Sequence, residues 1–386
     1  MTKITVSSRQ SWVSRLGQSI GGVIVGLLLL VGGLVLLWWN EGRAVITAKA
    51  LEEGAGLVVS VAADRVDPVN EGRLVHVAGR AQVEGLLADP DFPFVSAPAL
   101  ILERRVEMFQ WREDQETREV KKLGGSVETE TTYTYRKVWS GSLYSSSRFY
   151  DSAGHSNPSS LPYSDLTLKA SGARLGAFSL PQDLLNLSAT ETLRVPENAP
   201  LEGRGQASAG GIYLGNNPNA PEIGDVRIQY AYAPMQDVSV VARQTGDSFD
   251  AFPVSGGKRS LQMLKPGLAD AAAIFEDAHT ENMILTWILR AAGTLLGLCL
   301  GLYLVFRPLS VAGDVIPALG SLLGIGLGLA AFFLGLAIAL LVIALAWLFY
   351  RPLLGIFMLA AAAATAYGLR ALAKRRELPA SNPSAR

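Results

Sequence analysis

Long runs of apolar residues stand near both ends of the chain, and a polar, mixed segment lies between them. Residues 20–39 contain no charge, and a bilayer core of roughly 30 Å requires about 20 apolar residues in a helix. The run ends in Leu-Trp-Trp-Asn-Glu at 37–41, where a tryptophan pair suits a membrane interface and no small-residue cleavage site is present. We therefore predict an uncleaved signal anchor at 20–39 rather than a cleaved signal peptide.

The C-terminal apolar stretch is divided by charged residues and prolines. A second span is predicted at 285–306, before Arg307-Pro308. The 36 residues of 315–350 carry no charge, so this run is too long for one untilted span. We expect it to be tilted, broken near Pro317 or packed against protein. Arg351-Pro352 interrupts the helix, and a short last span is predicted at 353–371. The alternative is three spans, with the long run and the last segment forming one hairpin.

The zero net charge of the chain conceals an asymmetry. Residues 40–284 hold 32 Asp and Glu against 23 Lys and Arg, whereas the rest of the chain holds 2 against 11. Basic flanks are typical of cytoplasmic segments, so four spans would place both termini in the cytoplasm. The expected order is a cytoplasmic N-terminus at 1–19, transmembrane helix 20–39, a β-rich non-cytosolic domain at 40–284, transmembrane helices at 285–306, 315–350 and 353–371, and a basic cytoplasmic tail at 372–386.

The domain between the first two spans carries strand signals. Its segments rich in β-branched and aromatic residues are 73–78, 100–111, 131–139, 225–232 and 238–243. In the second of these, Leu100, Leu102, Val106 and Met108 share one face, and Glu103, Arg105 and Glu107 share the other. We therefore predict a membrane protein of four transmembrane α-helices, one N-terminal and three C-terminal, with a large β-rich non-cytosolic domain of small-barrel-like β units.

The chain shows no catalytic constellation. His76, His155 and His279 are far apart in the sequence, and no metal-ligand spacing accompanies them. The single Cys299 excludes an intrachain disulfide and a cysteine-based zinc site. No nucleophile motif is present. We accordingly expect no enzyme activity, no cofactor, no metal site and no nucleic-acid partner.

Glycines recur at helical spacing in the C-terminal runs. Small residues four apart let helix backbones approach closely in lipid. The helix-packing candidates are Gly293, Gly297 and Gly301 in one run and Gly320, Gly324 and Gly328 in the next. We expect them to pack helices within one chain or between copies in a homo-oligomer. Transport is disfavoured because no predicted span has an ionisable residue at mid-depth.

Seven sequence blocks in order resemble the transmembrane protein 43 family, also called LUMA, over nearly the whole chain. They lie at 40–44, 70–76, 106–111, 221–227, 241–244, 286–293 and 347–353. The residues that carry the resemblance, hereafter the family-motif residues, are Asn40, Glu41, Gly42, Arg43, Glu71, Gly72, Arg73, Trp111, Gly224, Asp225, Arg290, Arg351 and Pro352.

The resemblance implies a four-span protein with a large non-cytosolic domain and no attached enzymatic activity. For the animal family member it implies the endoplasmic reticulum and inner nuclear membrane, with lamin and emerin partners and signalling scaffolds. The chain has 25 Arg and 9 Lys, and this preference for Arg favours a GC-rich bacterial genome. The expected location is then an inner membrane, with the domain in the periplasm. We therefore predict a non-enzymatic membrane scaffold or sensor that organises membrane or envelope partners. The alternative is a membrane-associated enzyme or transport accessory subunit acting through the non-cytosolic domain.

Overall fold

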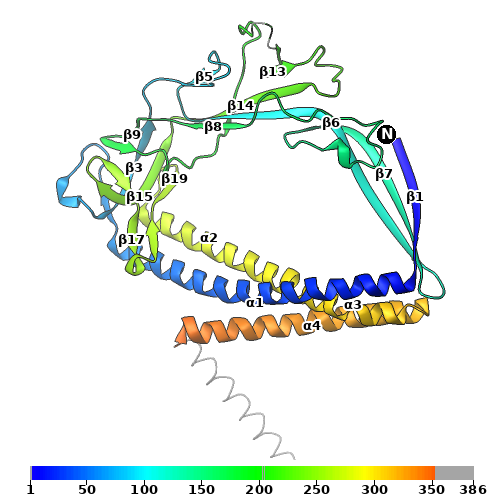
Figure 1. Cartoon of the computed structure of the whole chain (residues 1–386). Coiled ribbons are helices and arrows are strands. Elements are labelled where there is room, and N and C mark those ends of the chain that lie inside the picture. Colours follow the sequence, from blue (N-terminus) through cyan, green and yellow to red (C-terminus); the bar gives the residue numbers. More distant parts are fainter. Residues whose placement is uncertain (1, 202, 204, 353–386) are drawn as a thin grey trace, which may run out of the picture. The chain divides into compact units, whose positions relative to one another are not determined.

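The computed structural model describes residues 2–352 apart from 202 and 204, and within them the chain forms two compact units (Figure 1). The β-rich unit holds residues 2–9, 49–120 and 127–279. Of the described residues, the helical unit holds 10–48, 121–126 and 280–352. The predicted last span at 353–371 and the basic tail at 372–386 lie outside the described residues, so the number of spans stays a prediction.

Three long apolar helical segments supply the helical unit. Each is long and apolar enough to cross a membrane by length and composition. The first is α1 (Trp12–Leu57) and the third is α4 (Pro317–Tyr350). The second is continuous from Ala271 to Gly313 and consists of α2 (Ala271–Ala292), a π-helical segment (Gly293–Cys299) and α3 (Leu300–Gly313); we call it the α2–α3 run.

The helices extend beyond the predicted spans. The 46-residue α1 contains the predicted 20–39 segment and continues to Leu57, past Gly54 and Gly56. The run at 315–350 is a single helix that begins at Pro317, because proline at the first helical position gives up only an N–H that would lack a partner there.

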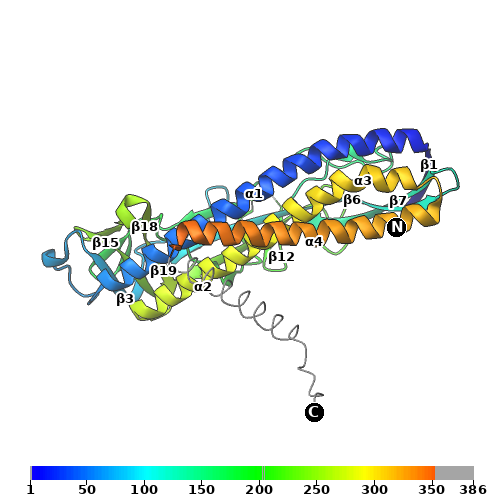
Figure 2. The same cartoon turned by 90° about the horizontal axis from the view of Figure 1, so that it is seen from below.

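Glycines allow α1 to lie directly against the α2–α3 run, as Figure 2 shows for α1 and α3. A Cβ atom added to Gly297 would lie 2.5 Å from the Cα of Gly33. A Cβ atom on Gly301 would lie 2.9 Å from the carbonyl oxygen of Gly26. A Cβ atom on Gly293 would lie 2.9 Å from the Cγ atom of Leu37. The row Gly293, Gly297 and Gly301, hereafter the first glycine ladder, therefore packs against a helix of the same chain.

The contacts of the second glycine ladder, Gly320, Gly324 and Gly328, differ from one glycine to the next. A Cβ atom on Gly320 would collide with Asp314, and one on Gly324 would lie 3.0 Å from the Ser310 hydroxyl oxygen. Among the described residues, no atom lies within 4 Å of such a Cβ on Gly328. Within the part of the helical unit that the structure describes, only Gly320 and Gly324 of this set therefore make a close contact.

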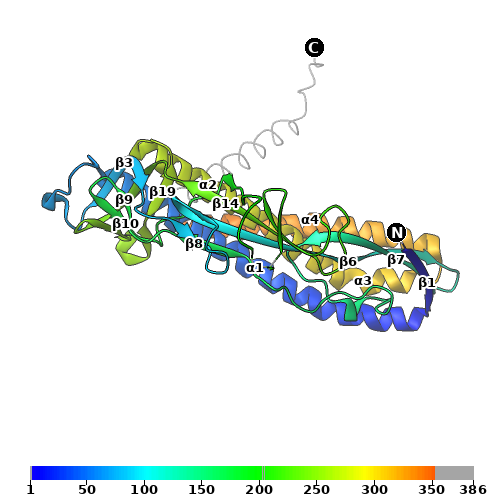
Figure 3. The same ribbon diagram turned by 90° about the horizontal axis from the view of Figure 1, so that it is seen from above.

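The first sheet of the β-rich unit has eight strands and is built on the long antiparallel strands β6 and β7, which run side by side (Figure 3). Its order is β1-β7-β6-β14-β13-β12, with β11 paired to β14 and β8 paired to β6. The bounds are β1 (Thr2–Gln10), β6 (Ala99–Lys121), β7 (Val127–Ser140), β8 (Leu166–Lys169), β11 (Glu191–Leu193), β12 (Gln206–Ser208), β13 (Gly211–Leu214) and β14 (Val226–Pro234).

The second sheet nearly closes on itself. Its order is β10-β9-β3-β15-β16, with β19 paired to β15 and β2 paired to β3. At the meeting of its two ends, the Ser179 amide donates to the Asp247 carbonyl at 2.6 Å, and Phe178 stacks on Phe249. The bounds are β2 (Val59–Val61), β3 (Leu74–Gln82), β9 (Ala173–Leu175), β10 (Phe178–Leu180), β15 (Asp237–Thr245), β16 (Ser248–Asp250) and β19 (Met263–Pro266).

Short elements complete the β-rich unit. Two small hairpins pair β4 (Leu87–Ala88) with β5 (Ser96–Ala97), and β17 (Phe252–Val254) with β18 (Arg259–Leu261). Single 3-10 turns lie at Pro68–Asn70, Ser146–Arg148 and Ser255–Gly257.

The predicted strand segments lie in β3, β6, β7, β14 and β15, and the β-rich nature of the domain is confirmed. On β6 the predicted inner residues Leu100, Leu102, Val106 and Met108 are all buried. Leu100 joins a core around the second sheet, whereas the other three pack with Ile228 and Tyr230 of β14.

The glycine contact yields a first test. Gly297→Leu is expected to lower the thermal stability of the helical unit in detergent, by about 1–3 kcal/mol or more, because a side chain there overlaps the backbone of Gly33. The matched control is Gly328→Leu, which makes the same change on an apolar helix at a position that no atom of residues 2–352 approaches. If the two variants unfold at the same temperature, the close packing of α1 on the α2–α3 run is not what stabilises the unit.

Candidate functional site: buried charged clusters

A carboxylate is buried inside the helical unit. Glu41 follows the apolar run of α1 and is 1% exposed. Arg290 of α2 donates two parallel hydrogen bonds to it, from Nε to Oε1 at 2.6 Å and from Nη2 to Oε2 at 2.8 Å. Such bidentate pairs are the strongest charge-assisted contacts of arginine, and burial removes competition from water.

Trp347 of α4 is the third partner of this pair. Its indole Nε1–H donates to Glu41 Oε2 at 2.8 Å. The Arg290 guanidinium also lies 4.9 Å from the ring centroid of Trp287 and 5.7 Å from that of Trp347. One ion pair therefore joins α1, α2 and α4, and the two tryptophans surround its positive charge with cation–π contacts.

A second layer of polar contacts joins α1 to α2. Arg43 donates to Asn40 Oδ1 on its own helix and to Thr286 Oγ1 at 2.8 Å and Asn282 Oδ1 at 2.9 Å on α2. Asn40 donates from its amide to the Thr286 carbonyl at 3.1 Å, and Asn282 donates to the Ala44 carbonyl. We call Asn40, Glu41, Arg43, Asn282, Thr286, Arg290 and Trp347 together the Glu41 cluster.

Gly42 adds a close aromatic contact beside the Glu41 cluster. A Cβ atom on Gly42 would lie 2.7 Å from the Cζ atom of Tyr350, so any larger residue would displace that ring. Trp38 packs on the rings of Phe349 and Tyr350. Trp and Tyr side chains gather at membrane–water interfaces, so this end of the helical unit has an interfacial composition.

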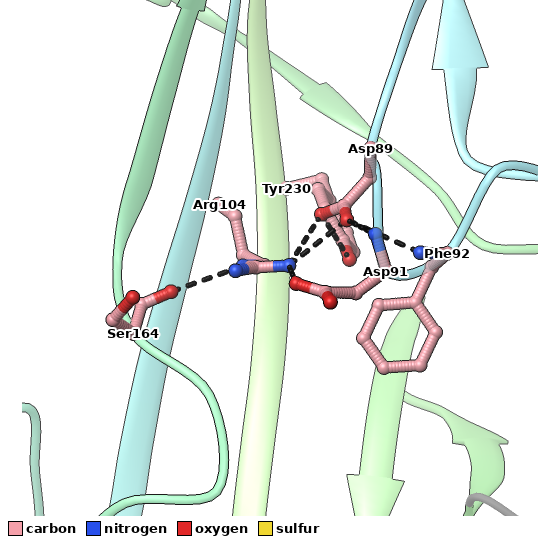
Figure 4. A network of polar contacts seen from close by, with 6 residues as sticks. All are labelled: Asp89, Asp91, Phe92, Arg104, Ser164 and Tyr230. Carbon is pink, nitrogen blue, oxygen red and sulfur yellow. Dashed lines mark hydrogen bonds and ion pairs between the residues drawn. The ribbon is translucent and has the colours of Figure 1, made fainter.

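A second buried ion pair lies in the β-rich unit, where Arg104 of β6 meets Asp89 and Asp91 (Figure 4). Arg104 Nη1 donates to both Asp89 oxygens, at 2.9 and 3.0 Å, and to Asp91 Oδ2 at 2.7 Å. Arg104 Nε donates to the Ser164 carbonyl at 3.0 Å. Tyr230, opposite Arg104 in the sheet register, donates its hydroxyl to Asp89 Oδ2 at 2.9 Å.

This arrangement, the Arg104 cluster, keeps its tyrosine protonated. Burial, and then the charge of Asp89, raise the pKa of Tyr230 well above its ordinary value. The neutral hydroxyl thus donates to the carboxylate and takes no proton from it. The sequence held a signal for this cluster, because alternation along β6 places Arg104 on the same inner face as Leu102 and Val106.

A third buried carboxylate lies at the other end of the helical unit. Asp314, between α3 and α4, is 1% exposed and accepts from Arg15 Nη2 and Lys121 Nζ, each at 2.6 Å. Arg15 also donates to the Gly125 carbonyl at 2.7 Å, and Trp12 donates from Nε1 to the Val311 carbonyl at 2.9 Å. We call these residues the Asp314 cluster. Asp314 is the only acidic residue between Glu281 and Glu377, which is the sequence signal that could have identified it.

Comparison with known proteins decides the family. The family model described as Transmembrane protein 43 matches residues 108–352. Transmembrane protein 43 of Homo sapiens is 35% identical over 91% of this chain and 90% of its own length, and that of Mus musculus is 36% identical over the same shares. The chain belongs to the transmembrane protein 43 family. The Drosophila melanogaster homolog is 29% identical over 88% of this chain and 92% of its own length. No solved structure matches the chain.

The first block of family-motif residues and Arg290 meet in the Glu41 cluster. Asn40, Glu41 and Arg43 reach it from α1, with Gly42 beside it, and Arg290 reaches it from α2, more than 240 positions away. Near the end of α4, the Arg351 amide donates to the Trp347 carbonyl, and Pro352 follows as the last described residue. Five of the thirteen family-motif residues, Asn40, Glu41, Gly42, Arg43 and Arg290, thus make contacts between helices.

The other family-motif residues serve the β-rich unit. Glu71 accepts from the Gly246 amide, and Gly72 adopts a positive φ of 74° that favours glycine. The Arg73 amide donates to the Asn70 carbonyl within the same turn. Gly224 also has a positive φ and donates to the Phe109 carbonyl. Asp225 accepts from the Tyr213 hydroxyl at 2.5 Å.

Trp111 lies in an aromatic cluster of the same unit. It contacts the His155 ring edge-on, and His155 stacks on Tyr135 with centroids 3.7 Å apart. Tyr135 donates to Glu113 Oε2, and burial, followed by this hydrogen bond, raises the pKa of Tyr135 to about 12. The cluster therefore holds a neutral tyrosine at physiological pH.

His76 has structural partners. Its Nδ1 lies 3.1 Å from the Ser60 hydroxyl, and its Nε2 lies 2.9 Å from the Ala269 carbonyl oxygen. Within residues 2–352 apart from 202 and 204, no group of three His, Cys, Asp or Glu side chains is placed to hold a metal ion. The three buried carboxylates that we describe each face a cation instead.

Removing the buried carboxylate tests the Glu41 cluster. Glu41→Gln is expected to destabilise the helical unit by about 3–5 kcal/mol, because it leaves the Arg290 charge buried without a counter-ion. Thermal unfolding of the purified full chain in detergent measures the effect. Glu116→Gln makes the same change on an exposed strand position and is expected to stay within about 0.5 kcal/mol of the wild type. Equal melting temperatures for both variants would contradict a structural role for Glu41.

A charge-conserving change tests the Arg104 cluster. Arg104→Lys is expected to lower the stability of the β-rich unit by about 1.5–3 kcal/mol, because lysine keeps the charge and loses the planar set of donors. The neighbouring Arg105→Lys is the control, because the Arg105 side chain is 70% exposed. If lysine at 104 is tolerated as well as lysine at 105, a simple point charge suffices there.

Proposed function

We propose that this chain is a non-enzymatic membrane scaffold that presents its β-rich unit to other membrane or envelope proteins. The observation that supports this most is the Glu41 cluster. The family-motif residues of α1 and α2 form bidentate and networked contacts with one another inside the helical unit. Residues so engaged fix the positions of helices, which is what an assembly platform requires.

The buried charges of the β-rich unit support the same reading. A catalytic carboxylate or base needs an open face toward a substrate. Both oxygens of Asp89 accept hydrogen bonds from Arg104, and one also accepts from Tyr230. Since these groups join β6 and β14 to the segment that follows β4, we infer that they stabilise the sheet.

Homo-oligomerisation remains part of the proposal. The Gly293, Gly297 and Gly301 ladder is filled by α1 of the same chain, so contact between copies must use another surface. Gly328 on α4 has open space around it among the described residues, and large apolar side chains such as Phe333, 63% exposed there, lie on the same helix. We infer that any contact between copies in the membrane would involve α4.

We propose a bacterial inner membrane as the location, with the β-rich unit in the periplasm, on the arginine bias of the composition. The relatives reported above are animal proteins, and for a eukaryotic source the endoplasmic reticulum or inner nuclear membrane takes its place. Signalling would follow from the partners assembled.

Crosslinking in native membranes tests the scaffold proposal. The tagged full chain is crosslinked in its own cells, purified in mild detergent, and analysed by native electrophoresis and mass spectrometry. A scaffold is expected to run well above its 41.1 kDa mass together with other membrane proteins at a fixed ratio. The control is an unrelated tagged multi-span protein at the same expression level. Recovery of only the single chain would contradict the proposal.

A further inference from the structure

Strand β6 is longer than the strands that pair with it on one side. On that side, β14 pairs with it as far as Met108, and β8 pairs with it at residues 101–104. On the other side β7 runs along it, and β1 follows β7, as Figure 1 shows. Within residues 2–352 apart from 202 and 204, no strand covers the β14 side of β6 beyond Met108. The segment from Arg112 to Val120 therefore has one free strand edge, hereafter the β6 edge.

Hydrogen bonds just before this segment show which backbone groups point outward. The Phe109 amide donates to the carbonyl of Asp225, the residue before β14, so Phe109 directs its backbone away from β7. Two residues on, the Trp111 amide donates to Asn157 Oδ1 in the same direction. Backbone groups alternate between the two sides of an antiparallel strand, so the odd-numbered residues face outward. On the β6 edge these are Glu113, Gln115, Thr117 and Glu119.

The side chains of the β6 edge are charged and accessible. Residues 115–120 are all exposed. Asp114 is ion-paired with Arg112 of the same strand, whereas Glu116 and Arg118 have no ion pair among the described residues. An unpaired strand edge is a template for a further strand. Its charges decide which strand it accepts, because like charges directly opposite each other destabilise the pair.

Most registers between two copies of the β6 edge are repulsive. In an antiparallel pair, outward-facing residues oppose outward-facing residues, so the two-fold axis passes through one residue, which then faces its own copy. Five of the seven residues at 113–119 are charged, and each of them would face a like charge at the axis. With the axis at Gln115, Asp114 would stand opposite Glu116, which is again repulsive.

The remaining register has its axis at Thr117. Thr117 then stands opposite its own copy and Gln115 opposite Glu119, and each of these outward-facing pairs exchanges two backbone hydrogen bonds. Glu116 stands opposite Arg118 on both sides of the axis, which forms two ion pairs. Within residues 114–120 no like charges oppose each other in this register. The charge order of the β6 edge is therefore complementary to itself in one register only.

We propose that the β6 edge is a contact between two copies of this chain, which join their eight-stranded sheets antiparallel about Thr117. The inference rests on the homo-oligomerisation proposed above and assigns it a surface in the β-rich unit, separate from any contact through α4. A strand pair of this length is a weak contact by itself. Confinement of the copies to one membrane raises their effective concentration and favours such a contact.

Disulfide crosslinking of the full chain in native membranes tests this contact. The background is Cys299→Ser, which removes the only cysteine. Thr117→Cys is expected to give a crosslinked dimer under mild oxidation, because opposed residues that share backbone hydrogen bonds have Cα atoms about 5.5 Å apart, within disulfide range. The matched control is Gln115→Cys, also exposed, whose Cα would lie about 14 Å from that of its own copy. This control is expected to crosslink at least about tenfold less.

A charge exchange distinguishes specific pairing from chance collision. In the Thr117→Cys chain, Glu116→Arg sets like charges opposite each other at two positions, so the crosslinked fraction is expected to fall about fivefold or more. Adding Arg118→Glu to that variant sets opposite charges against each other again, and the crosslink is expected to return. Both positions are exposed, so the melting temperature in detergent is expected to stay that of the background throughout.

Three results would each overturn this proposal. They are no dimer from Thr117→Cys, equal dimer from Thr117→Cys and Gln115→Cys, and no recovery of the crosslink when Arg118→Glu is added. The scaffold proposal has a different readout, namely the recovery of other membrane proteins at a fixed ratio. If that recovery is seen while the Thr117→Cys chain stays monomeric, the β6 contact is wrong and the scaffold proposal is unaffected.

Discussion

The ion pair between Glu41 and Arg290 is the contact on which the helical unit depends. An apolar bundle gains little by bringing helices together in lipid, because acyl chains are as apolar as leucine. A buried carboxylate changes this, because leaving it unpaired costs several kcal/mol. Arg290 and Trp347 must both reach Glu41, and this fixes α1, α2 and α4 at one level. The glycines then set how closely the helices approach.

Features that depend on neighbouring residues could be predicted from the sequence, whereas contacts between distant residues could not. Apolar runs and strand alternation are local, so the long helices and the core face of β6 could be predicted from neighbouring residues. The partners of Arg104 could not, because Asp89 and Tyr230 lie 15 and 126 positions away and only the folded sheet brings them together. Arg104 lies on an apolar strand face and Asp314 lies in an apolar stretch. A charged residue in such a position indicates a buried partner of opposite charge.

Strand β1 shows a different limit. Its sequence, Thr-Lys-Ile-Thr-Val-Ser-Ser-Arg-Gln, has two apolar residues, Ile4 and Val6, at strand spacing, whereas its basic residues predicted only a cytoplasmic N-terminal segment. In the structure β1 pairs with β7, and Arg15, near the start of α1, contacts Asp314. The side of the membrane on which these residues lie stays a prediction from charge. The family-motif residues lie in contacts between helices and in turns and side-chain contacts of the β-rich unit, where they stabilise the fold.

A double-mutant cycle on Glu41 and Arg290 measures the central contact most directly. The wild type, Glu41→Gln, Arg290→Gln and the double variant are unfolded by heat or denaturant in the same detergent, and the coupling free energy is taken from the four stabilities. A directly paired buried charge is expected to give a coupling of about 1–3 kcal/mol, with the double variant more stable than the sum of the single losses would allow. Strict additivity of the two losses would contradict the account, because it would mean that the two side chains stabilise the protein independently.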